Sequence, residues 1–145
     1  MSKVEDFLTK AEEQEIVEAI QLAEKNTSGE IRVHLEKETS VAVYDRAMEV
    51  FGELQMYKTK SKNGVLIYVA VKDKNFVICG DQGINDIVGN DFWNSTKEIM
   101  VEYFKKGENK NALVNGILKA GEQLKKHFPF ESDDENEISN EISKG

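Results

Sequence analysis

The stretch GVLIYVAVKDKNFVIC, residues 64–79, decides the fold because it contains two apolar segments joined by a short polar turn. Residues 65–71 are continuously apolar and rich in β-branched side chains, which is typical of a central strand covered on both faces. Residues 72–75 are polar, and residues 76–79 are apolar again. We therefore predict an antiparallel hairpin.

A further strand and four helices are expected around this hairpin. Residues 31–35 alternate as a strand with one face in the core does. Residues 9–27 read as a helix that begins with the capping-box pattern Thr9 to Glu12 and ends at Gly29. Residues 41–56 form another helical pattern, with Ser40 as its N-cap. Two more helices are expected near residues 92–104 and 113–128, the last one ended by Pro129.

This order, α, β, α, β, β, α, α, predicts a small mixed sheet. The first two strands are joined through a helix, so they should be parallel with a right-handed crossover, and the hairpin makes the third strand antiparallel to the second. The end of the third strand, at Asp81, then lies on the same edge as the start of the first, at Glu30. Asp45 should lie on the opposite edge.

The 145 residues suit one domain, expected over residues 1–130, followed by an acidic tail over residues 131–145. The tail has six acidic residues and one lysine, which accounts for −5 of the net charge of −8. With two large apolar residues it is expected to be disordered or a frayed helix. An acidic body with an acidic tail lacks the basic surface that nucleic acids or anionic membranes require.

Other features of composition bear on compartment and partners. No apolar run approaches the length of a membrane span, and the N-terminal residues do not resemble a secretory signal. Cys79 is the single cysteine, which excludes an internal disulfide and suits a reducing compartment. We expect a cytoplasmic protein that is a monomer and binds no nucleic acid and no membrane.

Residues 78–93, ICGDQGINDIVGNDFW, raise the question of a cation site. Asp81, Asp86 and Asp91 lie in a glycine-rich loop without a basic residue, and carboxylates are ligands that Ca²⁺ and Mg²⁺ prefer. The same residues also suit ordinary roles, with Asp91 as a helix N-cap and Asp86 in an Asx-turn. The spacing is not that of an EF-hand, so the local pattern leaves both interpretations open. His34 is expected to be a packed or surface histidine, and Cys79 an inert core thiol.

Several short blocks, in this order and spacing, resemble the TPM domain family, which occurs in thylakoid-lumen photosystem II repair proteins and in many bacteria. The resemblance covers about residues 7–130. The blocks are SGEIRV (28–33), NGVLIYV (63–69), GDQGI (80–84), VGNDFW (88–93) and FKKG (104–107).

The resemblance implies a three-layer α/β/α sandwich with a mixed sheet and helices on both faces. It also implies a groove at one sheet edge that binds divalent cations, calcium especially, and the acid-phosphatase activity attributed to some members. Glu30 matches the acid that opens the first strand, Gly83 the loop glycine, and Asp91 falls near the aspartate before the third helix. Where many members read G-Y-G-L-E-G, Asp81 and Asp86 are additional acids and Asn85 stands near the family's glutamate.

We therefore expect a domain that binds a divalent cation through Asp81, Asp86, Asp91 and Glu30. Ca²⁺ is the expected ion, with Mg²⁺ or another divalent ion as the alternative. A second interpretation is a metal-dependent acid phosphatase acting on phosphomonoesters, in which the ion polarises a phosphoryl oxygen. A third is a metal-free domain that binds a protein partner.

Overall fold

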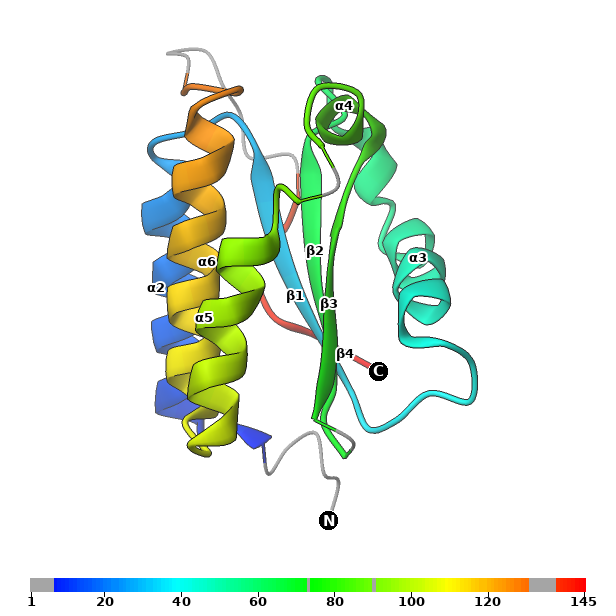
Figure 1. Cartoon of the computed structure of the whole chain (residues 1–145), viewed down its shortest axis with the longest axis vertical. Coiled ribbons are helices and arrows are strands. Elements are labelled where there is room, and N and C mark those ends of the chain that lie inside the picture. Colours follow the sequence, from blue (N-terminus) through cyan, green and yellow to red (C-terminus); the bar gives the residue numbers. More distant parts are fainter. Residues whose placement is uncertain (1–6, 73, 90, 131–137) are drawn as a thin grey trace.

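A computed structural model describes residues 7–72, 74–89, 91–130 and 138–145 of the chain. A four-stranded sheet lies between two helical layers (Figure 1). Helices α2 (Lys10–Glu24), α5 (Asn94–Lys105) and α6 (Asn109–Lys125) cover one face, and α3 (Val43–Glu53) covers the other. The short helices η1 (Met56–Lys58) and α4 (Gln82–Asn85) lie in the connections. The predicted three-layer α/β/α sandwich is confirmed.

The strand order is β3 (Asn75–Gly80), β2 (Gly64–Ala70), β1 (Glu30–Glu36) and β4 (Ser143–Lys144). β1 pairs in parallel with β2, and β2 pairs in antiparallel with β3, as the chain order predicted. β4 pairs in parallel with β1 and extends the sheet beyond the three strands that the sequence indicated.

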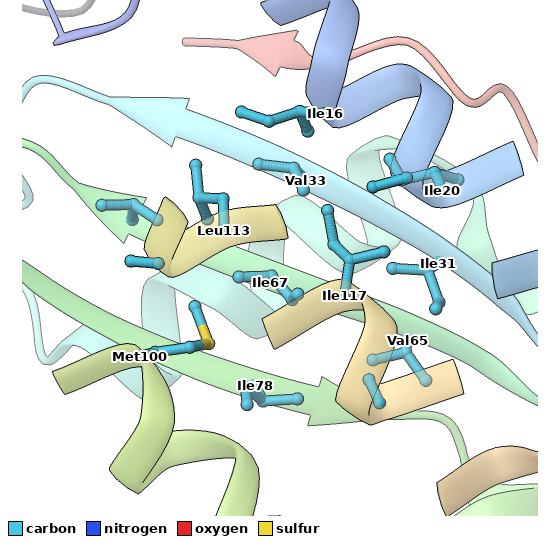
Figure 2. Packing of buried hydrophobic residues seen from close by; sticks show 14 of the residues in the cluster. Ile16, Ile20, Ile31, Val33, Val65, Ile67, Ile78, Met100, Leu113 and Ile117 are labelled. Carbon is cyan, nitrogen blue, oxygen red and sulfur yellow. The ribbon is translucent and has the colours of Figure 1, made fainter. Parts of the chain in front are cut away.

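Every residue of β2 is buried. The core consists of two apolar clusters, one on each face of this strand. Val65, Ile67 and Val69 belong to the larger cluster, together with side chains of α2, α5 and α6, many of which are visible in Figure 2. Leu66 and Tyr68 belong to the smaller cluster beneath α3. This two-sided burial explains why the strand is continuously apolar rather than alternating.

Several helix ends differ from the prediction; for example, α6 begins at Asn109 and ends at Lys125, before Pro129, and α3 ends at Glu53. The Thr9 and Glu12 capping box is present, but α2 ends at Glu24, well before Gly29. After the helix, the Thr27 hydroxyl donates to the carbonyl oxygen of Phe128, and the chain continues into β1 at Glu30. Ser40 does not cap α3, because the N-cap residue is Ala42 and no side chain bonds the first turn.

The prediction of a disordered tail is wrong for residues 138–145, while residues 131–137 lie outside the described part. Ile138 is 2% exposed, Ser143 and Lys144 pair with His34 and Leu35, and the Gly145 amide donates to the Leu35 carbonyl over 2.9 Å. The open edge of β1 offers backbone groups that a further strand can satisfy. Within the described residues, we find no helix with both the length and the apolar character that a membrane crossing needs.

Candidate functional site

Glu30, Gly64 and Asp81 form one row across the sheet at the edge where β1 and β2 begin and β3 ends. Glu30 is the register partner of Gly64, and the Asp81 amide donates to the Gly64 carbonyl over 2.9 Å. Directly opposed residues in a sheet point to the same face, so the two carboxylates flank a residue that has no side chain. The prediction that Glu30 and Asp81 share an edge is confirmed.

Asp81 is a buried carboxylate with one satisfied oxygen. The residue is 4% exposed and is the N-cap of α4, where Oδ1 accepts a hydrogen bond from the Gln82 amide over 2.7 Å. Oδ2 is also buried, and no group in the described part of the chain donates to it. A buried polar atom in this condition is costly unless something else, such as an ion or a water molecule, compensates it.

Glu30 is 3% exposed, and its Oε1 accepts a hydrogen bond from the Ile138 amide over 2.6 Å. Beside it lies Glu24, whose Oε2 accepts from the Ile31 amide over 3.0 Å. Burial raises the pKa of Glu24 to about 8, against the lowering effect of the Ile31 hydrogen bond and with a smaller contribution from the charge of Glu30. Sequence reasoning missed Glu24, since an acid in the last turn of a helix resembles any solvated residue.

Asp86 and Asp91 do not join this pair. Both are exposed: Asp86 is the C-cap of α4, and Asp91 accepts a 3.4 Å hydrogen bond from Asn94. Asp91 does not cap α5, whose N-cap is Trp93. Among the residues that the structure describes, no three His, Cys, Asp or Glu side chains are placed closely enough to hold a metal ion. The four predicted ligands therefore divide into a buried pair and two surface carboxylates.

Backbone carbonyl groups add further oxygen atoms at this edge. A Cβ at Gly83 would lie 2.3 Å from the Ser61 carbonyl oxygen and 2.5 Å from that of Lys62, so the first turn of α4 packs directly on the loop before β2. Only glycine permits this approach. The same loop carries the buried polar residues Thr59 and Asn63.

The donor chemistry at this edge is that of hard oxygen ligands, which suits Ca²⁺ or Mg²⁺ rather than a thiolate-bound metal. Cys79, two residues before Asp81, is 2% exposed, and burial raises the pKa of its thiol to about 11. Cys79 is therefore a core thiol, and its inertness stays a prediction.

A second polar cluster lies at the far end of β1. Glu36 accepts from Arg46 Nη2 over 2.6 Å, from Arg46 Nε over 2.9 Å and from the Tyr68 hydroxyl over 2.6 Å, and its Oε1 lies 3.1 Å from His34 Nε2. Arg46 foremost, then Tyr68 and His34, lower the pKa of Glu36 to about 2 despite its burial. Burial lowers the pKa of His34, whose Nδ1 lies 2.9 Å from Ser143 Oγ. These mutual contacts make the cluster a structural one.

Comparisons with known proteins agree with this architecture. The chain is similar to the BA42 protein from the psychrophilic bacterium Bizionia argentinensis, with 60% identity over 100% of both chains and a TM-score of 0.93. It shares the fold of the N-terminal domain of a P. gingivalis protein, with 16% identity, a TM-score of 0.67, and coverage of 84% of this chain and 79% of that one. Among curated proteins, none matches. The family model for the TPM domain matches residues 1–123, and the chain therefore belongs to the TPM domain family.

Proposed function

We propose that this TPM domain binds a divalent cation, Ca²⁺, at the sheet edge formed by Asp81 and Glu30. The observation that carries the proposal is the buried Oδ2 of Asp81, which accepts no hydrogen bond from the described residues. A bound cation would supply the missing compensation, because a carboxylate removed from water needs an opposite charge or a hydrogen-bond donor.

The surroundings of Asp81 support a cation over other ligands. The second buried carboxylate, Glu30, lies in the same row on the same face of the sheet. The Ser61 and Lys62 carbonyl groups approach the helix that Asp81 caps. Ca²⁺ takes six to eight oxygen ligands, a mixture of carboxylate, carbonyl and water oxygens. An anionic ligand would instead meet two buried carboxylates.

We assign Asp86 and Asp91 an outer role. Both carboxylates are exposed at the ends of the α4 to α5 connection. Surface charges of one sign raise the local concentration of a counter-ion and its rate of association. In this arrangement they attract the cation to the edge, and Asp81 and Glu30 hold it.

The proposal does not extend to phosphoryl transfer. An arginine that neutralises the transferred phosphoryl group is a common part of such catalytic sites, and the chain has two arginines, Arg32 and Arg46. Arg46 is engaged with Glu36 at the far end of β1, and Arg32 Nε donates to the Glu141 carbonyl over 3.2 Å. Among the described residues, no contact at this edge favours catalysis over binding.

The test is a Ca²⁺ titration followed by amide chemical shifts and by thermal unfolding. We expect shifts at Glu30, Asp81 and the residues of α4, and a gain in stability of about 3 kcal/mol when free Ca²⁺ reaches about 100 times Kd. Asp81→Asn should abolish both effects, although asparagine can still cap α4. Asp45→Asn, in the first turn of α3 at the opposite edge, is the matched control and should bind as wild type does.

Mg²⁺ is titrated in parallel to establish selectivity, since it demands a stricter octahedral geometry. The absence of any response at millimolar Ca²⁺ and Mg²⁺ would refute the proposal and favour a metal-free interaction domain. Equal binding by wild type and Asp81→Asn would move the site away from this edge.

A further inference from the structure

Residues 138–145, here called the strap, run along the outer edge of β1. Ile138 lies beside Glu30, where β1 begins, and Ser143 and Lys144 pair with His34 and Leu35, near its end. The strap therefore connects the proposed cation site with the opposite end of the strand.

Ile138 contacts the cation site in two ways. Its amide donates to Glu30 Oε1 over 2.6 Å, a short charge-assisted hydrogen bond. Its side chain is 2% exposed, and Cδ1 lies 3.3 Å from where a Cβ on Gly64 would be. Ile138 Cδ1 thus covers Gly64 together with the Met56 carbonyl oxygen, which lies 3.2 Å from the same point.

The remaining anchors of the strap lie farther along β1, from Arg32 toward the end of the strand. The Glu141 carbonyl accepts from Arg32, Ser143 Oγ lies 2.9 Å from His34 Nδ1, and Lys144 Nζ lies 3.0 Å from a carboxylate oxygen of Glu13. Ile142 is partly buried against the larger core cluster. The strap can therefore be loosened at its far end without a change in any proposed ligand.

We propose that Ile138 is a positioning residue for the cation site, so that docking of the strap and binding of the cation favour each other. This inference rests on the proposed function. A hydrogen bond to a ligating carboxylate fixes its orientation, and loss of such a bond typically weakens metal binding 10–100-fold. The apolar cover that Ile138 provides excludes water from the row, which strengthens the attraction between a cation and the two carboxylates.

The coupling has a definite sign. An ionised carboxylate has two oxygens and about four lone-pair sites, and the Ile138 amide uses one of them. The cation and the amide hydrogen bond can therefore be accommodated on one carboxylate. By linkage, if the strap strengthens cation binding by some factor, the cation must strengthen strap docking by the same factor.

Two variants of the full chain test the coupling. Ile138→Pro removes the amide donor and keeps an apolar side chain, and Ile142→Asp loosens the strap away from the site. We expect each to raise the calorimetric Kd for Ca²⁺ by about 10-fold or more. Ile138→Val keeps the amide donor and removes only Cδ1 of the apolar cover, and should therefore raise the Kd less than Ile138→Pro does.

The reciprocal effect is read in the wild-type protein by hydrogen exchange. Saturating Ca²⁺ should slow exchange of the Gly145 amide, which bonds Leu35 far from Asp81, by a factor similar to the loss of affinity in the variants. Unchanged or tighter Ca²⁺ binding in both variants, with unchanged Gly145 exchange, would overturn the coupling while the cation site stands. A wild-type protein that binds no Ca²⁺ would overturn the proposed function and the coupling together.

Discussion

Replacing Arg46 by methionine tests how the far end of β1 is held together. The guanidinium donates twice to Glu36, over 2.6 and 2.9 Å, and the arginine side chain is 25% exposed while that of Glu36 is 10% exposed. Methionine preserves much of the packing volume and removes the charge. Glu36 would then keep only Tyr68 and His34 as partners for a largely buried carboxylate.

The magnitude follows from the pKa of Glu36. A fall from 4.5 to about 2 corresponds to about 3 kcal/mol of preference for the ionised form in the folded state, shared among Arg46, Tyr68 and His34. Since Arg46 contributes most, we expect Arg46→Met to lower the free energy of unfolding by about 2 kcal/mol at pH 7.

The loss should depend on pH in a defined direction. In wild type, a depressed folded pKa gives stability that is complete above pH 4.5 and is lost as the pH falls toward 2. In the variant, Glu36 remains buried but lacks the guanidinium, so its pKa should be higher than in wild type. Protonation of Glu36 at low pH should therefore destabilise the folded variant less than it destabilises the folded wild type. The difference in the free energy of unfolding between wild type and variant should therefore become smaller as the pH falls from 7 to about 3.

Urea unfolding of both proteins at pH 7 and at about pH 3 measures this difference. Lys72→Met is the matched control, because Lys72 lies 3.2 Å from Glu38 with both side chains about half exposed, at 50% and 49%. An exposed pair of this kind should contribute under about 1 kcal/mol. The reasoning would be refuted if Arg46→Met lowers the free energy of unfolding no more than Lys72→Met does, or if its effect is the same at both pH values.

Three further outcomes are expected. Glu24→Gln should raise the free energy of unfolding by about 1 kcal/mol or more at pH 8 and leave it unchanged near pH 4. The reason is that the raised pKa of Glu24, about 8, penalises folding only at a pH where the carboxyl of the unfolded chain is ionised. Equal changes in the free energy of unfolding at pH 8 and pH 4 would contradict this. Gly83→Ala should cost about 1–3 kcal/mol in urea unfolding through its collision with backbone carbonyls, whereas Gly89→Ala, with nothing within 4 Å of the added Cβ, is the control. Cys79 should resist iodoacetamide at pH 8 until urea unfolds the chain, and rapid alkylation of the folded protein would disprove its burial.

The topology was predictable because few residues determine it. The apolar run that became β2 had to be covered on both faces, and the short polar turn after it left room only for a hairpin. With β1 parallel to β2, the positions of Glu30 and Asp81 on one edge followed from chain direction alone. Neither conclusion required knowledge of side-chain contacts.

The grouping of the aspartates was less predictable, because nearness in sequence is a poor guide around a turn. Asp81 caps α4 with its own side chain and Asp86 ends the same helix, so the two lie at opposite ends of a helical turn. A helix of four residues, Gln82–Asn85, is too short to show apolar periodicity. The sequence therefore indicated a loop in which three carboxylates converge, whereas the chain forms a helix that separates Asp81 from Asp86.

The strap shows why composition alone misjudged the residues after Phe130. A segment with two isoleucines among many polar residues buries too little apolar surface to fold by itself, which is why disorder was expected. Its docking site, however, requires polar groups as well as apolar ones. Three polar residues of β1, Glu30, His34 and Glu36, are buried, and the strap provides the Ile138 amide for the first and Ser143 Oγ for the second. Because unpaired buried polar groups are costly, a largely polar segment is the complement that this edge of the sheet needs.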